Sequence, residues 1–301
     1  MDIIGKRNWY FLISLLVLIP GIISLFVFGL NLSIDFTGGS RITFSLPKVA
    51  SSVEIDKIRS AFEEENIKVS TIEKSSNLVF VRTQPIDQVQ DTKVINKLNS
   101  EIKNFKQEEF ETIGPTIGAE TTSNAVKAVI IASFLIVLYI TLSFRKVPKP
   151  ASSFRFGVCA IIALVHDTLV VVGAFAIFGY FFGVEIDSLF VTAILTVIGF
   201  SVHDTIVVFD RIRENLKRMG ATSFPQVVND SILQTVDRSL NTSLTVILVL
   251  LAMLLFGGAS IKWFVVALLV GITTGTYSSI FIAAAFLVVW QNWSQKRKAL
   301  K

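Results

Sequence analysis

The sequence has few of the residues that build disulfides and metal centres. Its 301 residues include one cysteine, Cys159, and two histidines, His166 and His203. A single thiol forms no intrachain disulfide, and it has no Cys or His companions at the spacing of a zinc site. We therefore expect no disulfide, no bound metal and no resident cofactor.

Charged residues are also scarce, at 17% of the chain, whereas 52% of the residues are hydrophobic and the mean hydropathy is +0.64. A soluble globular protein is less apolar than this. Runs of about 20 apolar residues are long enough to cross a bilayer as helices. Six such runs predict an α-helical polytopic membrane protein with six transmembrane helices, at 9–30, 125–144, 156–181, 189–209, 240–256 and 264–290.

The basic residues gather on one side of these predicted helices. Two Lys or Arg precede the first helix, four lie in 145–155, five lie between Asp210 and Leu240, and four lie in the tail. The other side has only Lys127 and Lys262 near its membrane ends. The positive-inside rule therefore places both termini in the cytoplasm, in a multi-pass protein of the cytoplasmic (inner) membrane. The net charge of +5 then reflects topology and contact with membrane lipid, and nucleic acid is not an expected partner.

This orientation puts the segment 31–124 outside the cytoplasm, between the first two helices. It has 11 Lys plus Arg and 14 Asp plus Glu, which is the composition of an ordinary soluble domain. Alternating and helical apolar patterns predict strands at 41–46, 68–73, 78–83 and 110–117, with helices after the capping box at Ser51 and at 87–103. The order βαββαβ predicts one ferredoxin-like α+β domain. Nothing in this domain resembles a catalytic set, so a binding module is expected.

The chain is thus predicted to have three parts. Residues 1–30 form the N-terminus and the first transmembrane helix, and 31–124 form the extracytoplasmic domain. Residues 125–301 form a five-helix transmembrane bundle with cytoplasmic loops and a basic C-terminal tail.

Both histidines belong to a repeated motif in the apolar segments, VHDTLVV at 165–171 and VHDTIVV at 202–208. An aspartate at the centre of a membrane helix costs about 2.5 to 3.5 kcal/mol on insertion scales, whereas an interhelical hydrogen bond contributes about 0.6 kcal/mol. This imbalance favours a functional carboxylate. For His166 and Asp167 we favour a packed polar pair that clasps the helical hairpin, with a secondary proton relay as the alternative.

The second copy has a different setting. Thr192, Thr196, Gly199 and His203 share one helical stripe, so periodicity alone favours His203 over Asp204 as the more enclosed residue. In the next predicted helix, Arg238, Asn241 and Thr242 begin a polar line that runs into the bilayer. Arg238 is at a depth from which its long side chain could form an ion pair with Asp204. These residues predict a proton relay at Asp204 and Arg238, with His203, Asn241 and Thr242 as secondary candidates.

The last predicted helix has small residues at four-residue spacing, Gly271, Gly275 and Ser279. Such a face permits close packing against another helix in lipid. A sliding contact is the alternative, and static packing is favoured.

Four stretches, in order along the chain, resemble the SecD/SecF family of the resistance-nodulation-division superfamily, and its SecF subunits in particular. They are IDFTGGS at 34–40, SFRFGVCAIIALVHD at 153–167, VIGFSVHDTIVVFDRIREN at 197–215, and RSLNTSL with GTYSSIFIA at 238–244 and 275–283. The resemblance covers nearly the whole chain. Its one noted departure is His203, where relatives often have Asn.

The resemblance implies a function and several site residues. It implies an accessory subunit that, with SecD, uses the proton gradient to drive late steps of polypeptide export through the Sec channel of SecY, SecE and SecG. It further implies YajC and the translocating preprotein as partners, with protons or sodium ions as the coupling ion. Asp204 matches the family's essential membrane carboxylate and Arg238 its partner. The linker to the outside domain matches at Asp35, Phe36, Thr37, Gly38 and Gly39.

Other function classes are less consistent with the sequence. A proton-driven small-solute exporter of the same superfamily generally has about twice as many helices in one chain. A scaffold without transport chemistry would leave the membrane charges with a structural role only. His-Asp doublets occur in metal phosphohydrolases, but here they lie in apolar helices without further ligands, so the protein is not expected to be an enzyme.

Overall fold

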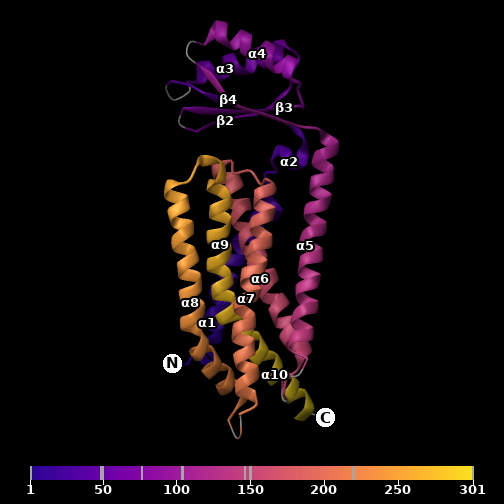
Figure 1. Ribbon diagram of the computed structural model, residues 1–301, viewed down its shortest axis with the longest axis vertical. Coiled ribbons are helices and arrows are strands. Elements are labelled where there is room, and N and C mark those ends of the chain that lie inside the picture. The colour runs from indigo at the N-terminus through magenta and orange to yellow at the C-terminus, as the bar shows by residue number, and fades with distance from the viewer. Residues whose placement is uncertain are drawn as a thin grey trace. The chain divides into compact units, whose positions relative to one another are not determined.

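The computed structural model describes residues 2–47, 51–75, 77–102, 105–145, 147–148, 151–218, 220 and 222–299. The chain divides into two compact units (Figure 1). The membrane unit comprises Met1–Leu30, Lys127–Val184 and Leu189–Lys301. The sheet unit comprises Asn31–Val126 together with Glu185–Ser188, a short loop from much later in the sequence.

The sheet unit has one four-stranded antiparallel sheet with two helices. Its elements are β1 (Gly39–Ser45), α3 (Ser52–Glu64), β2 (Val69–Ser75), β3 (Leu78–Thr83), α4 (Gln88–Glu101) and β4 (Lys106–Ile113). The strand order is β2-β3-β1-β4, so the first and third strands of the sequence lie side by side in the middle. This is the ferredoxin-like α+β topology, and the predicted fold class is confirmed.

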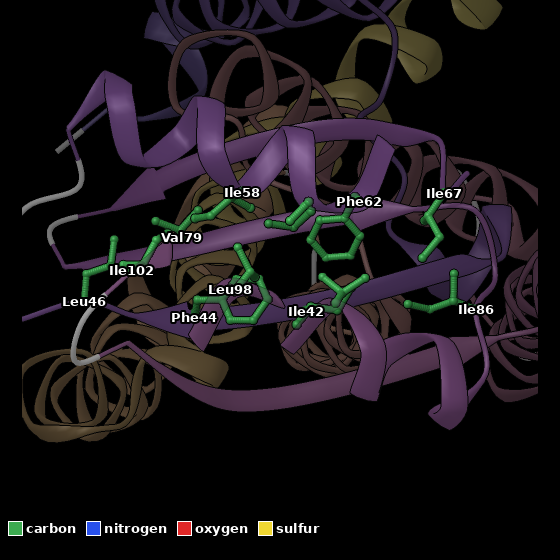
Figure 2. Packing of buried hydrophobic residues seen from close by; sticks show 13 residues of the cluster. Ile42, Phe44, Leu46, Ile58, Phe62, Ile67, Val79, Ile86, Leu98 and Ile102 are labelled. Carbon is green, nitrogen blue, oxygen red and sulfur yellow. The ribbon is translucent and has the colours of Figure 1, made fainter. Parts of the chain in front are cut away.

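Capping boxes start both helices of this unit. Ser51 and Glu54 exchange hydrogen bonds ahead of α3, and Asp87 and Gln90 do the same ahead of α4. The helices then bury an apolar face against the sheet, and Figure 2 shows side chains from both layers meeting in one core. The aromatic ring of Phe44 from β1 packs there with its centroid 6.4 Å from that of Phe62.

The last strand is displaced from its predicted position. It covers Lys106–Ile113, where we expected 110–117, because its pairing with β1 ends at the pair Gly39 and Ile113. Pro115 then starts α5, since proline has no N–H to leave unpaired in the first turn of a helix. Ile117, predicted as a strand residue, lies in that helix. The predicted end of α4, Lys103, lies outside the described residues.

Among the described residues, six helices are long and apolar enough to cross a membrane, so this part of the fold class is confirmed as well. They belong to the membrane unit, apart from the start of α5 up to Val126 and the first residue of α7, which belong to the sheet unit. They are α1 (Arg7–Val27), α5 (Pro115–Ser143), α6 (Ser153–Phe182), α7 (Ser188–Leu216), α8 (Phe224–Phe256), and a sixth span of three parts. That span joins α9 (Lys262–Ser278), a π-helical segment (Ser279–Ala283) and α10 (Ala284–Ala299). Short 3₁₀ turns at Ile4–Lys6 and Ala259–Ile261 precede the first and last spans.

Two glycines bring α1 and α6 into backbone contact. A Cβ atom built on Gly173 would lie 2.6 Å from the Cα atom of Gly21. A side chain at Gly173 would therefore force the helices apart, whereas a Cβ atom at Gly21, 3.1 Å from the Gly173 Cα atom, would require a smaller shift. The contact holds α1 beside the helix that carries the first VHDT motif.

The core of the sheet unit includes one buried carboxylate. Asp91 of α4 is 1% exposed, and Gln107 of β4 donates its amide N–H to both carboxylate oxygens at 3.2 Å. Burial raises the pKa of Asp91 above its ordinary value, although the hydrogen bonds from Gln107 act in the opposite direction. A raised native pKa means that the folded unit favours the protonated form. This contribution is complete below the ordinary value of about 3.9 and is lost as the pH rises through the native pKa.

We therefore predict that Asp91→Asn raises the free energy of unfolding of the sheet unit at pH 7, because Asn removes a buried charge and keeps a hydrogen-bonding group. The gain should shrink as the pH falls through the raised native pKa of Asp91 and should be smallest below about 4, where Asp91 of the parent chain is protonated in both the folded and the unfolded state. Hydrogen exchange of the amides of 31–126 against urea measures this difference. Glu63→Gln, an exposed change on α3, is the matched control, and a gain that grows in acid would contradict the prediction.

Candidate functional site

Two aspartates are buried inside the membrane unit, one on each helix of the hairpin formed by α6 and α7. Asp167 lies at the middle of α6, and Asp204 lies a little past the middle of α7. Each is only 1% exposed. Because an unpartnered carboxylate is costly to bury, their hydrogen-bond donors decide what each can do.

Asp167 has three close polar partners. Its Oδ2 atom accepts hydrogen bonds from Ser201 of α7 at 2.5 Å and from Ser278 of α9 at 2.7 Å. Its Oδ1 atom is 2.9 Å from Nδ1 of His166, whose Nε2 atom is 2.5 Å from the hydroxyl of Ser14 of α1. The network connects α1, α6, α7 and α9, so it extends well beyond the hairpin that we expected it to clasp.

Asp204 has fewer and longer contacts. Ser243 of α8 donates to its Oδ2 atom at 3.4 Å, and Nδ1 of His203 is 3.7 Å from its Oδ1 atom. The Ser243 hydroxyl also lies 2.5 Å from that of Thr276 on α9. The two buried carboxylates therefore differ in how closely their partners hold them.

The start of the π-helical segment lies between the two aspartates. Ser278 binds Asp167, whereas the next residue, Ser279, donates to the carbonyl of Ser201 at 3.0 Å and lies 2.9 Å from the hydroxyl of Thr205. Consecutive serines of the sixth span therefore contact Asp167 of α6 and, on α7, Ser201 and the neighbour of Asp204, Thr205. Single π-helical turns are often found at functional sites.

The small residues predicted for helix packing lie against α7. A Cβ atom on Gly271 would meet the Val197 side chain at 2.2 Å, and one on Gly275 would meet Cβ of Ser201 at 3.0 Å. Ser279 continues the same face with its contact to the Ser201 carbonyl. The close approach brings α9 near enough for Ser278 to reach Asp167.

The expectation that His203 is more enclosed than Asp204 is wrong. The His203 side chain is 62% exposed in this chain. The small and polar stripe that contains it, with Thr196 and Gly199, is an exposed face of α7. The enclosed face instead carries Ser201 and Asp204, because these residues face α8 and α9.

Arg238 also lies on an exposed face, and within the described part of the chain no ion pair joins it to Asp204. The physical reason is helical spacing. Ser239 and Ser243, four residues apart, occupy the buried face of α8, and Arg238 projects about 100° from Ser239. Asn241 is exposed as well, whereas the hydroxyl of Thr242 donates to the Arg238 carbonyl of its own helix at 2.9 Å.

The predicted linker motif lies in the first segment of the sheet unit, residues 31–39, which we call its base. Asp35, Phe36 and Thr37 lie in a short helix, α2 (Ile34–Thr37), which Ser33 caps by accepting a hydrogen bond from the Asp35 N–H. Gly38 and Gly39 have φ angles of 71° and 130°, where a side chain is strained. Added Cβ atoms would also lie 2.8 Å from the Pro115 Cα atom and the Thr83 carbonyl oxygen, respectively.

The loop between α6 and α7 is part of this same base. The Ile186 N–H donates to the Asn31 carbonyl at 2.7 Å, and the Ile186 carbonyl accepts from the Ser33 N–H at 2.8 Å. Asp35 accepts a hydrogen bond from the N–H of Ser188, the first residue of α7, at 2.8 Å. The hairpin that carries both aspartates is therefore continuous with a loop built into the sheet unit.

An ion pair strengthens that loop. Arg82 of β3 pairs with Glu185 and also donates to the Leu32 carbonyl at 2.9 Å. Burial raises the pKa of Glu185 above its ordinary value, against the opposite effect of the Arg82 guanidinium beside it. Neither residue was expected as functional, since nothing in the sequence shows that a membrane-hairpin loop meets the third strand of a distant domain.

The hydroxyl residues around the aspartates were missed for another reason. Ser201, Ser243, Thr276 and Ser278 are single small polar residues in apolar helices, a pattern too common to single out. A signal was nevertheless present, because Ser201 precedes Asp204 by one helical turn, and Ser243 follows Ser239 by one turn. Within the described ranges, no group of three or more His, Cys, Asp or Glu residues is placed to hold a metal ion.

Comparison with known proteins assigns these features to a family. Residues 93–293 match "Protein export membrane protein SecD/SecF, C-terminal", and residues 23–46 match "SecD/SecF GG Motif", which contains Gly38 and Gly39. The protein translocase subunit SecF of Thermobaculum terrenum is 49% identical, over 97% of this chain and 94% of its own length. The protein translocase subunit SecDF of Bacillus subtilis is 36% identical over 98% of this chain, but this covers 39% of SecDF.

A solved structure is similar along the whole chain. The crystal structure of SecDF from Thermus, described as a translocon-associated membrane protein, has a TM-score of 0.83 and 34% identity. The match covers 97% of this chain and 39% of that one. In both SecDF proteins, a region similar to this chain is therefore joined to a longer remainder.

The network around Asp167 leads to a prediction about stability. Ser278→Ala removes one donor from a buried carboxylate, which should destabilise the membrane unit by about 1–3 kcal/mol. The apparent Tm of the detergent-solubilised chain measures the loss. Thr274→Ala is the matched control, because among the described residues the Thr274 hydroxyl bonds the Val270 carbonyl of its own helix and no carboxylate. Equal decreases in Tm for the two variants would show that Ser278 gives Asp167 no special support.

Proposed function

Because the chain belongs to the SecD/SecF family of protein-export membrane proteins, we propose that it is an accessory subunit of the Sec translocase that acts together with SecD. In this proposal, protons moving down their gradient drive late steps of polypeptide export. The partners are SecD, the SecY, SecE and SecG channel, YajC and the translocating preprotein. The protein lies in the cytoplasmic membrane with both termini inside, in keeping with its basic loops.

The observation that carries the proposal is the setting of Asp204. It is buried within a membrane span and has one weak hydroxyl donor and a histidine nearby. A carboxylate in this environment is the group that an approaching proton or cation changes most. Each proton that crosses the membrane releases about 2.3 kcal/mol per 100 mV, enough to bias a change in helix packing.

SecD is the proposed neighbour of the exposed polar face on α7 and α8. Thr196, Gly199 and His203 on α7, with Arg238 and Asn241 on α8, are exposed although they lie within helices apolar enough to cross a membrane. Lipid covers such a face poorly, since polar groups in hydrocarbon lack partners. In the SecDF relatives, the remainder of the longer chain supplies a candidate cover. Arg238 would then be shared between Asp204 and the partner during the cycle.

The loop at Glu185–Ser188 supplies a route from the aspartates to the outside. It belongs to the sheet unit by its hydrogen bonds and to the α6–α7 hairpin by its covalent bonds. A shift of α7 on protonation of Asp204 would therefore pull on the base of the domain that we propose contacts the preprotein. In this proposal, the coupling ion is the only ligand that the movement of α7 requires.

We predict that Asp204→Asn abolishes the stimulation of export by the proton gradient while ATP-driven export continues. Asn keeps the size of the side chain but cannot ionise. The assay follows completion of preprotein translocation into inverted membrane vesicles that contain SecD and the variant, with and without a gradient. Asp237→Asn, an exposed carboxylate on α8, is the matched control and should retain the stimulation.

Two results would contradict this prediction. Full gradient-dependent export by Asp204→Asn would leave the chain with a scaffold role. The other result is that a sodium gradient stimulates export into vesicles with the parent protein and that a protonophore leaves this stimulation intact. This result would identify sodium, not protons, as the coupling ion.

The proposed interface yields a second prediction. A photoreactive phenylalanine analogue in place of His203 should crosslink to SecD several-fold more than the same analogue in place of Phe134 on α5. The two positions are similarly exposed, at 62% for the His203 side chain and 64% for Phe134, so exposure does not explain a difference. Equal crosslinking would place SecD elsewhere.

A further inference from the structure

A cavity with two arginines lies at one end of the membrane unit, away from the aspartates. It has a volume of about 500 Å³ and is lined by Tyr139, Leu142 and Ser143 at the end of α5, by Arg145, and by Arg213 near the end of α7. Counting crossings from α1, these ends lie on the same face of the membrane as the N-terminus. The basic loops assign that face to the cytoplasm.

The cavity contains unused hydrogen-bond donors. Nε of Arg213 is buried and has no partner among the described residues. Across the same described ranges, the Arg145 guanidinium and the hydroxyls of Tyr139 and Ser143 have no side-chain hydrogen bond or ion pair. Four donors of this kind, two of them cationic, suit an oxyanion that can accept several hydrogen bonds at once.

Arg213 is held firmly enough to form such a site. It pairs with Asp210 at 2.5 Å, and its guanidinium carbon lies 5.9 Å from the centre of the Phe144 ring. Phe144 in turn packs against Phe156 and Phe209, with ring centroids 5.3 and 6.1 Å away. Asp210 offsets one of the two positive charges, which leaves the cavity a net cationic surface suited to a singly charged ligand.

The surface beside the cavity is apolar. The apolar part of α5 is only 6% buried within this chain, and Leu135, Leu138, Tyr139 and Leu142 are exposed up to the cavity wall. A ligand there would have its charged group among the arginines and hydrocarbon chains along α5. Inorganic phosphate has no hydrocarbon part that could cover these exposed side chains of α5.

We propose that this cavity binds the phosphate diester headgroup of an anionic phospholipid. The two arginines, Tyr139 and Ser143 hold the phosphate oxygens, and the acyl chains lie along the exposed side of α5. Basic pockets between helices at the cytoplasmic side of membranes are suited to such headgroups. The site is separate from the proposed proton relay and needs neither SecD nor a substrate.

Native mass spectrometry of the whole chain in detergent tests the site, with phosphatidylglycerol, phosphatidylcholine or inorganic phosphate added. The parent chain should retain phosphatidylglycerol in preference to phosphatidylcholine. Arg145→Gln and Arg213→Gln should each weaken retention about five- to tenfold. Arg145 is exposed, so its variant keeps the test valid if Arg213→Gln disturbs folding. Asp210→Asn should strengthen retention, because it removes the negative charge beside the arginines while the Phe144 ring still lies against Arg213.

Arg218→Gln is the matched control. It removes the same charge close to the end of α7 that carries Arg213, and the Arg218 side chain is 76% exposed. Retention equal in all variants, or a decrease in Arg218→Gln as large as in the cavity variants, would overturn the proposal. Inorganic phosphate that displaces the lipid at low millimolar concentration, or raises the Tm as much as the lipid does, would overturn the assignment to a phospholipid.

Discussion

A carboxylate inside a bilayer has no water to donate hydrogen bonds to it, so the protein must supply the donors from its own helices. Asp167 shows what this requirement does to a membrane bundle. Its donors come from α7, from α9 and from the histidine beside it, and that histidine is bound in turn by Ser14 of α1. The arrangement of these helices satisfies the carboxylate, so its chemistry and their packing depend on each other. The glycines at 21, 173, 271 and 275 permit the short distances involved.

The two VHDT motifs thus have opposite physical characters. In the first, histidine and aspartate are both buried, and each hydrogen-bonds to a neighbouring helix. In the second, the aspartate is buried with a weak donor, while the histidine lies on an exposed face with Arg238 on the next helix. The same four residues, VHDT, therefore give a fully buried His-Asp pair in α6 and a pair with an exposed histidine in α7. The difference arises from the neighbouring helices, since the motif itself is identical.

Much of this fold could be predicted from local patterns. Apolar runs revealed the six spans, and alternation with capping boxes revealed the βαββαβ order, because both signals lie within a few turns of chain. The last strand was misplaced, since the end of its pairing depends on Gly39, over 70 residues earlier. Asp204 was singled out from the sequence and is buried, but periodicity wrongly favoured His203 as the more enclosed residue. The neighbouring helices decide which face of a membrane helix is buried against protein. The residue types along one face do not show where those neighbours lie.

The loop at Glu185–Ser188 also bears on how such a protein can be divided. A domain inserted between two helices would ordinarily be removable by joining residue 30 to residue 127. Here that excision would leave the backbone groups of Ile186 without Asn31 and Ser33, Glu185 without Arg82, and the first N–H of α7 without Asp35. The chain passes from one unit to the other four times, after Leu30, Val126, Val184 and Ser188, whereas a simple insertion would do so twice. The sheet unit is therefore no independent cassette, and an exchange of domains between relatives must carry the hairpin loop with it.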